Sequence, residues 1–322
     1  MNSDIFSIKG IKIGQEQDDK ALTGCTVILC ENGATCSCDI RGGAPGTRET
    51  DLLNPINTVD KVHALVLSGG SAFGLECMSG VMNFLEEKNI GFDVGVTKVP
   101  IVTGAVLFDL TIGDYKIRPN MNMGYKACLN ANDKILDEGN FGAGCGCSIG
   151  KIRGKKYSMA SGIGSYTLKS GDLIVSAIVC VNAFGDIIED SKIIGGALND
   201  ELSGFINTSN YLIQNDKELS FDMKNTTIGA IITNAKLDKA KCKKVSQVAH
   251  NGYARSINPV HTGFDGDSIF TLATNEIEEK DINKISIMAS KAMEKAVIKA
   301  FKVSSSKDGI KSFEQLNENN NI

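Results

Sequence analysis

Two long amphipathic segments constrain the fold of this chain more than any other feature of its sequence. Residues 238–256 and 281–303 each repeat apolar side chains at intervals of three and four, which places them on one face of an α-helix. Both segments contain several alanines, which implies close packing against a helix or a sheet. Upstream, residues 173–182 are an apolar run, as are residues 227–232, and both are predicted as buried strands. Buried strands bounded by such helices predict a layered α/β sandwich.

The amino-terminal half shows the same mixture of strand and helix patterns. Residues 26–40 alternate in polarity on both sides of residues 31–33 (Glu-Asn-Gly), which predicts a β-hairpin that turns there. Residues 63–67 predict a short buried strand, and residues 75–85 repeat apolar side chains with helical spacing. The α/β pattern therefore extends over most of the chain.

Charge and hydropathy argue against nucleic acid or membrane as a partner. The 34 basic and 38 acidic residues are well mixed and leave a net charge of −4, so no basic patch is expected. The first ten residues do not resemble a signal peptide, and the longest apolar stretch, residues 173–184, is too short to span a bilayer. A soluble, cytoplasmic protein is expected. The polar tail after Ser304 is predicted to be frayed.

Ten cysteines are scattered along the chain, mostly in apolar segments. Without a secretory signal, we expect them to be buried free thiols. Two C-x-C pairs, Cys36/Cys38 and Cys145/Cys147, are the candidates for metal ligands. Neither pair has a second Cys pair or a nearby His that would complete four ligands, so no metal is expected.

The glycine-rich segment 142–151 (GAGCGCSIGK) has some features of a phosphate-binding loop. A Walker A motif, however, needs glycine where this chain has Cys145, and Ser or Thr after Lys151, where this chain has Ile152. A G-x-G-x-x-G fingerprint fails at Cys147. Nucleotide binding is therefore not expected. The glycines are predicted to allow close backbone approach, with Lys151 as a fixed charge beside them.

Residues 68–74 (SGGSAFG) join the predicted strand 63–67 to the following helix. Backbone N–H groups at a helix start attract negative or partially negative ligand atoms. Gly69, Gly70 and Ser71 are therefore candidates for substrate binding, and an ordinary packing turn is the alternative.

Two short segments can each carry chemistry or be purely structural. Asn225-Thr226 precedes an apolar strand and fits an ordinary strand start. Alternatively, the Thr226 hydroxyl attacks the preceding carbonyl, and hydrolysis of the resulting ester leaves Thr226 as a new amino terminus. Its α-amine can then act as a base at neutral pH. Asp265-Gly266-Asp267 is either a turn or a carboxylate pair that orients a nucleophile and stabilises a protonated amine.

Six segments, in this order, resemble one enzyme family. They are RGGAPGTRETDLL (41–53), HALVLSGGSAFGLE (63–76), RPNMNMGY (118–125), GNFGAGCGCSIGK (139–151), NTTIGAIITNA (225–235) and HTGFDGDSIF (261–270). From about residue 8 to about residue 303 the chain resembles the S58 peptidases, the L-aminopeptidase/D-esterase family that includes β-peptidyl aminopeptidases. Its NTT and DGD segments are also similar to the 6-aminohexanoate-oligomer endo-hydrolases.

The resemblance implies a four-layer αββα sandwich, similar in layering to Ntn hydrolases but with different connectivity. It implies a single domain (1–322) that cuts itself into an α subunit (1–225) and a β subunit (226–322). The fragments would stay associated and assemble into homotetramers or larger oligomers. No metal or organic cofactor is implied.

The resemblance also implies site residues at the matching positions. The bond between Asn225 and Thr226 would be cleaved, and Thr226 would be the nucleophile. The other implied residues are the acidic pair Asp265 and Asp267, an oxyanion-hole Asn182, a substrate-contacting Tyr125 and a supporting Lys151.

The activity expected from the residues and the resemblance is that of an aminopeptidase that cleaves short peptides or amides through an acyl-threonine intermediate. An endo-hydrolase of 6-aminohexanoate oligomers is the alternative within the enzymes. A non-catalytic small-molecule binding protein with an uncleaved chain is the alternative of another class.

Overall fold

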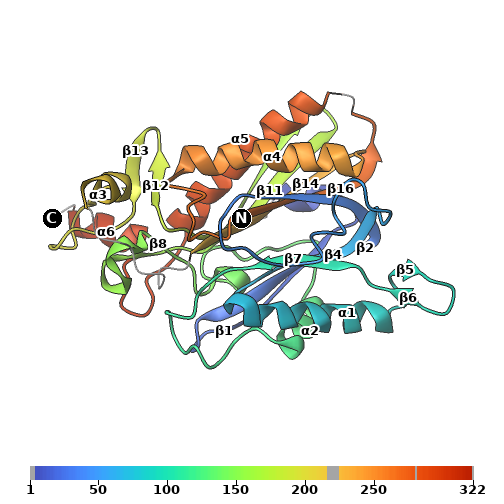
Figure 1. The fold of residues 1–322 in the computed structure, drawn as a ribbon, viewed down its shortest axis with the longest axis horizontal. Coiled ribbons are helices and arrows are strands. Elements are labelled where there is room, and N and C mark those ends of the chain that lie inside the picture. Colours follow the sequence, from blue (N-terminus) through green and yellow to red (C-terminus); the bar gives the residue numbers. More distant parts are fainter. Residues whose placement is uncertain (1–3, 216–224, 280, 321–322) are drawn as a thin grey trace.

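A computed structural model describes residues 4–215, 225–279 and 281–320 and shows two sheet layers between two helix layers (Figure 1). Helices α4 (Lys239–Ser256) and α5 (Ile282–Lys302) cover one side. Helices α1 (Cys77–Glu87) and α2 (Met121–Leu129) cover the other. The expected αββα layering is confirmed.

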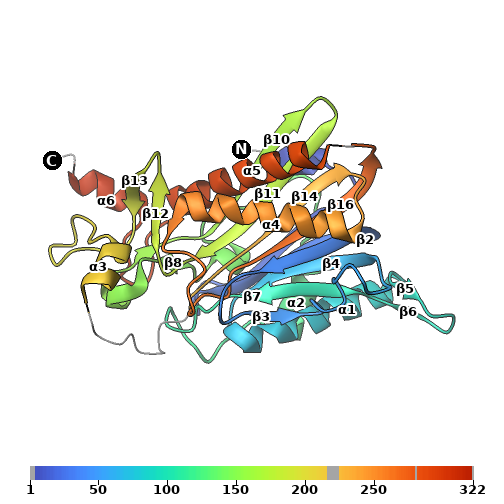
Figure 2. The ribbon, with the colours of Figure 1, turned by 45° about the horizontal axis from the view of Figure 1, so that its top comes forward.

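Nine strands form the main sheet system, in the order β10-β11-β14-β16-β2-β4-β7-β3, with β1 paired to β2. Their bounds are β1 Lys12–Asp18, β2 Thr23–Ile40, β3 Gly46–Arg48, β4 Lys61–Ser68, β7 Val102–Val106, β10 Ile163–Ser170, β11 Leu173–Asn182, β14 Thr226–Ala235 and β16 Ser268–Ile277. Strands β14 and β16 are parallel, whereas β11 and β14 are antiparallel. Figure 2 shows β11, β14 and β16 side by side beneath α4 and α5.

The hairpin predicted at residues 31–33 is wrong, because β2 continues through them as one strand. The first half of β2 pairs with β1 and β4, and its last six residues pair with β16. Its register with β4 shifts between Leu29 and Ala34, and Gly33 has a φ of 75°. A left-handed glycine and polar neighbours also suit a bulge, which bends a strand without reversing it. Strand β2 therefore belongs to both sheet layers.

Alternate residues of each central strand face different hydrophobic cores, as the pleat of a strand requires. Ile228, Ala230 and Ile232 of β14 join Leu65 and Leu67 of β4 in the core between the sheets. Ile231 faces the opposite way and packs in the core under α4 and α5. A third core lies between helices α1 and α2 and the sheet layer that contains β4 and β7. Three cores thus hold the four layers together.

The two long helices predicted from the sequence are confirmed to within one residue at their ends. Asp238 and Asp281 are their N-caps, and each carboxylate accepts a backbone N–H of the first turn. The two helices pack closely at Gly252. A Cβ atom at this position would lie only 2.6 Å from the carbonyl oxygen of Ser290 on the other helix. This close approach explains the small residues in both segments.

The tail after Ser304 is packed rather than frayed. Ile310 and Leu316 are buried, and residues Phe313–Asn320 form α6. The ammonium of Lys307 donates to the backbone carbonyls of Cys145 and Ser161, which ties the tail to the glycine-rich segment. The prediction of a frayed tail was wrong because it followed the mostly polar composition of the tail, in which only a few residues are anchored.

Short elements complete the described chain. They are the 3-10 helices Asp4–Ser7, Ser71–Glu76, Gly142–Gly144, Lys151–Arg153 and Lys155–Tyr157, helix α3 (Thr208–Gln214), and strands β5 Phe92–Asp93, β6 Lys98–Val99, β8 Ser148–Ile149, β9 Met159–Ala160, β12 Asp186–Glu189, β13 Lys192–Gly195 and β15 Ile257–Asn258. None of the helices in the described ranges is both long and apolar enough to cross a membrane. All ten cysteines are buried free thiols, as expected.

Candidate active site

The residues expected to react lie where the ends of three strands meet. Thr226 begins β14, and its register partner is Asn182, the last residue of β11. Because β14 and β16 are parallel, their amino ends share one edge, and Asn225 forms a backbone bridge with Asp265 just before β16. The topology therefore brings together residues that are about 40 positions apart in the sequence.

The Thr226 hydroxyl lies directly against the bond expected to break. It donates a hydrogen bond to the carbonyl oxygen of Asn225, and that oxygen also accepts the backbone N–H of Gly266 at 3.1 Å. A donor at this distance is suited to the negative charge that develops when the carbonyl is attacked. A side chain on Gly266 would lie 2.9 Å from the Thr226 hydroxyl, which explains the glycine between the two aspartates.

Asp267 is buried and held by three N–H groups. Its Oδ1 accepts the backbone N–H of Thr227 at 2.8 Å. Its Oδ2 accepts the backbone N–H of His261 at 3.1 Å and lies 2.8 Å from the His261 Nδ1. These contacts to both of its oxygens fix the orientation of the Asp267 carboxylate at the amino end of β14.

Asp265 is also buried, and its described hydrogen bonds come from a single residue, Thr262. Its Oδ2 accepts the backbone N–H of Thr262 at 2.9 Å and the Thr262 hydroxyl at 2.6 Å. Burial, and then the negative charge of Asp267, raise the pKa of Asp265 to about 6 despite these bonds. The Asp265 carboxyl therefore gains a proton as the pH falls through about 6.

The buried Asn182 and the half-buried Lys151 form a polar pair next to Thr226. The Asn182 Oδ1 accepts the Lys151 ammonium at 2.6 Å and the backbone N–H of Ser148 at 3.1 Å. The Asn182 Nδ2 donates to the carbonyl oxygen of Phe108 at 2.7 Å. Burial lowers the pKa of Lys151 to about 7, although Asp265 lies close enough to oppose this shift. Lys151 thus fixes the orientation of the Asn182 amide.

Thr226 faces a cavity of about 300 Å³ whose lining side chains carry no charge. The lining residues are Ala44, Pro45, Gly46, Ser71, Ala72, Val106, Leu107, Phe108, Asn225, Thr226 and Phe264. The cavity is suited to an uncharged, largely apolar group next to the nucleophile.

The backbone N–H groups proposed for substrate binding at residues 69–71 already have partners. Gly69 donates to the carbonyl of Gly24, Gly70 to the Asp109 carboxylate, and Ser71 to the carbonyl of Leu107. They are therefore not available to an anionic ligand. Ser71 still lines the cavity, and its role in substrate binding stays a prediction.

Tyr125 is not placed with the other candidate residues. It lies on α2, its hydroxyl donates to Glu87 at 2.7 Å, and its ring packs edge-on against Phe84. Phe108, which the sequence did not single out, instead lines the cavity and accepts the Asn182 amide. The roles of Gly266 and His261 were not predicted either, although both lie within the HTGFDGD segment.

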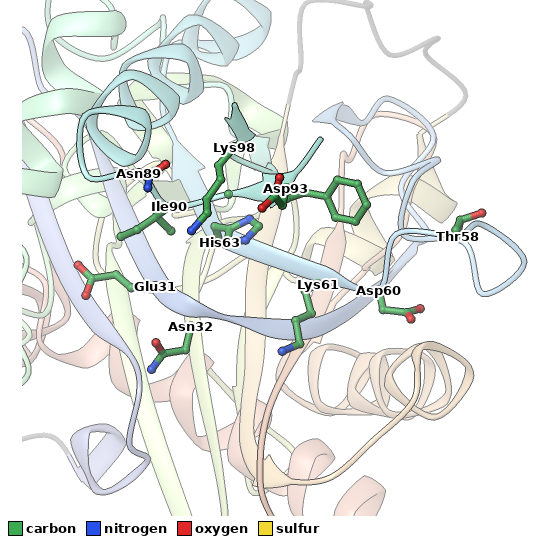
Figure 3. Close-up of a pocket in the computed structure, with 12 residues that line it drawn as sticks. Glu31, Asn32, Thr58, Asp60, Lys61, His63, Asn89, Ile90, Asp93 and Lys98 are labelled. Carbon is green, nitrogen blue, oxygen red and sulfur yellow. The ribbon is translucent and has the colours of Figure 1, made fainter. Parts of the chain in front are cut away.

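A larger cavity, of about 510 Å³, lies elsewhere and shares no lining residue with the Thr226 cavity (Figure 3). Charged side chains of both signs, including Glu31, Lys61, Asp93 and Lys98, surround His63 there. Among the residues that the structure describes, no cluster of three or more His, Cys, Asp or Glu side chains is arranged to hold a metal ion.

Sequence comparison relates the chain to peptide and amide hydrolases. The family model described as peptidase family S58 matches residues 3–314. An uncharacterized aminopeptidase of Mycobacterium leprae is 38% identical over 305 residues, which cover 86% of this chain and 80% of the relative. A 6-aminohexanoate-oligomer endohydrolase of Kocuria sp. is 28% identical over 280 residues, which cover 85% of this chain and 75% of the relative.

Structural comparison supports the same architecture. The L-aminopeptidase D-Ala-esterase/amidase of Ochrobactrum anthropi, described as a variant of the Ntn hydrolase fold, superposes with a TM-score of 0.72. The match covers 98% of this chain and 92% of that structure at 15% sequence identity. At this identity the likeness concerns the fold.

Proposed function

The chain belongs to peptidase family S58, and from this premise we propose that it is an autoprocessing N-terminal-threonine aminopeptidase that acts on short peptides or amides. Membership of the family makes it a hydrolase of peptide or amide bonds. One observation carries the finer proposal: the Thr226 hydroxyl lies on the Asn225 carbonyl, beside a buried pair of carboxylates.

Self-cleavage is the first step of the proposed mechanism. The Thr226 hydroxyl oxygen adds to the Asn225 carbonyl carbon, and the Gly266 N–H stabilises the oxyanion. The proton of the hydroxyl passes to the Thr226 nitrogen as the C–N bond breaks, and an ester links the two fragments. Water hydrolyses this ester, which leaves a carboxylate on Asn225 and restores the Thr226 hydroxyl beside its free amine. Asp265 and Asp267 favour this outcome because ionised carboxylates stabilise the ammonium that forms.

Turnover repeats the same chemistry on a substrate. The free amine of Thr226 takes the proton from its own hydroxyl, which attacks the substrate carbonyl. The amide of Asn182, oriented by Lys151, stabilises the oxyanion. The leaving amine receives the proton, and water hydrolyses the acyl-threonine ester.

Asn182→Ala is expected to lower kcat by about 10²- to 10³-fold with little change in KM, as for the loss of one oxyanion donor. Asn234→Ala is the matched control, because Asn234 is buried near the opposite end of β14 and contacts only backbone groups of residues 172 and 174 among the described hydrogen bonds. Steady-state kinetics on both variants test the role. Equal losses in kcat would show that Asn182 acts through the fold instead.

Self-cleavage is expected to slow as the pH falls through about 6, because burial and Asp267 raise the pKa of Asp265 to about that value. Below it Asp265 becomes protonated and no longer stabilises the Thr226 ammonium. Rates measured on freshly refolded chain between about pH 4.5 and 8 test this. Asp265→Asn should give a slower rate without this inflection, and an unchanged inflection in that variant would assign it to another group.

The uncharged cavity predicts a preference for substrates with apolar side chains. We expect kcat/KM for leucine p-nitroanilide to exceed that for aspartate or lysine p-nitroanilide by at least about tenfold, since a charged group would lose its hydration without gaining a partner. Equal kcat/KM values for the three compounds would show that the side chain of the substrate does not occupy this cavity.

A second candidate function, endo-hydrolysis of 6-aminohexanoate oligomers, is favoured by the 28% identical relative that carries this name. The two functions differ in their need for a free substrate amine. Acetylating the amino terminus of the substrate should abolish turnover by an aminopeptidase, whereas an endo-hydrolase should cleave the capped oligomer.

The two fragments are proposed to stay together after cleavage. Strand β14, in residues 226–322, pairs on one side with β11, in residues 1–225, and the core under α4 and α5 contains residues of both fragments. Size-exclusion chromatography of cleaved protein should show a single peak that contains both. A cytoplasmic location and assembly into homotetramers or larger oligomers stay predictions, to be tested by cell fractionation and light scattering.

A further inference from the structure

His261 contacts the Asp267 carboxylate through both its backbone N–H and its imidazole ring. Its backbone N–H and its Nδ1 both meet the same oxygen, Oδ2, at 3.1 and 2.8 Å. An ionised carboxylate only accepts hydrogen bonds, so Nδ1 carries the proton in this contact. His261 is therefore a donor from both its backbone and its ring.

The backbone conformation of His261 is unusual and makes this double contact possible. Its φ is 58°, in the left-handed region that non-glycine residues seldom adopt. Such a conformation is strained and persists only where surrounding contacts impose it. The contacts seen here are those to Asp267.

The second ring nitrogen of His261 has no such partner. Its Nε2 is buried and makes no hydrogen bond within the described residues. The ring packs edge-on against His250, with centroids 4.7 Å apart, and His250 bonds to the backbone carbonyl of Asp39 instead. All side-chain hydrogen bonding of His261 is thus directed at Asp267, and a buried unpaired nitrogen requires an explanation.

Asp267 connects this histidine to the nucleophile. The other carboxylate oxygen, Oδ1, accepts the N–H of Thr227, the residue that follows Thr226. A carboxylate that turned about its χ2 angle would lose this bond or the one to Nδ1. Asp267 also lies close to Asp265, whose pKa is raised by burial and then by the negative charge of Asp267.

We propose that His261 is a positioning residue for the reaction, which holds the Asp267 carboxylate oriented toward the amino end of β14. The proposal rests on the proposed function, because it assigns His261 a part in self-cleavage and turnover. His261 does not line the Thr226 cavity and so acts through Asp267.

Two isosteric replacements separate the donor from the ring. In His261→Asn the side-chain amide N–H occupies the place of Nδ1, and in His261→Gln it lies one bond farther out, nearer the place of Nε2. We expect His261→Asn to keep the self-cleavage rate and kcat within about fivefold of wild type. His261→Gln and His261→Ala should lower both by about 10- to 100-fold, with KM unchanged within about twofold, since a misplaced catalytic group costs rate rather than affinity.

His250→Gln is the matched control, because it alters the neighbouring buried ring but retains an N–H that can reach the Asp39 carbonyl. Thermal unfolding of each variant identifies any that fail to fold. Rates of His261→Gln and His261→Ala within about twofold of wild type would overturn the role of His261, as would a folded His261→Asn as slow as His261→Ala. A whole, inactive wild-type chain would overturn the proposed function and this role with it, whereas a cleaved wild type with unaffected variants overturns this role alone.

Discussion

Thr226→Val is expected to yield a whole chain that has no measurable hydrolase activity. Valine matches threonine in shape and keeps the buried start of β14 filled, but it removes the hydroxyl that lies on the Asn225 carbonyl. Without this oxygen neither the ester intermediate nor the new amino terminus can form. Denaturing electrophoresis and a peptide-amide assay on the purified variant measure both losses.

Thr227→Val is the matched control for this prediction. Thr227 is the next residue of the same strand, is fully buried, and its hydroxyl has no hydrogen-bond partner within the described residues. The same substitution should therefore leave cleavage and activity close to wild type, or stabilise the protein slightly. Cleavage between residues 225 and 226 in Thr226→Val would contradict the assignment of the nucleophile.

Asp267→Asn is expected to slow both self-cleavage and turnover by about 100-fold or more, within the range typical of positioned acid–base groups. The carboxylate faces three N–H groups, from Thr227 and from the backbone and ring of His261. An amide has a single acceptor oxygen, so its NH₂ group must face at least one donor. The variant also lacks the negative charge that we propose stabilises the Thr226 ammonium.

Asp186→Asn separates this catalytic loss from a general loss of stability. Asp186 is as deeply buried as Asp267, and it accepts the N–H groups of Ala197 and Thr208 and the Thr208 hydroxyl. Its substitution should lower the melting temperature by a similar amount but leave the kcat of the folded protein unchanged. Wild-type kinetics in Asp267→Asn would return the DGD segment to the role of a simple turn.

A layered α/β sandwich could be predicted because it depends on periodicity, whereas the four αββα layers were implied by the family resemblance. In β14, Ile228, Ala230 and Ile232 face the core between the sheets, whereas Ile231 faces the core under α4 and α5, as a period of two requires. The bend of β2 at residues 31–33 could not be predicted, because polar residues followed by glycine are typical of both a hairpin and a bulge. Only the pairing of β2 with β16 decides between them.

The candidate site could be predicted only where a motif carries its own chemistry. From the residues alone, Thr226 and the pair Asp265 and Asp267 also fit a strand start and a turn, and it was the resemblance to the S58 peptidases that implied their roles. The parallel pairing of β14 with β16 brings them together. His261 and Phe108 were missed because their roles depend on contacts that a linear pattern does not contain. Tyr125 lies on a different layer from Thr226, which a linear pattern does not show either.

The most direct test of the central claim is denaturing mass spectrometry of the purified wild-type protein. Self-cleavage predicts two pieces of about 24 and 10 kDa, in proportion to the lengths of residues 1–225 and 226–322, with the smaller one beginning at Thr226. A single species of 34.3 kDa that hydrolyses no peptide or amide would contradict the account and favour a non-catalytic binding protein.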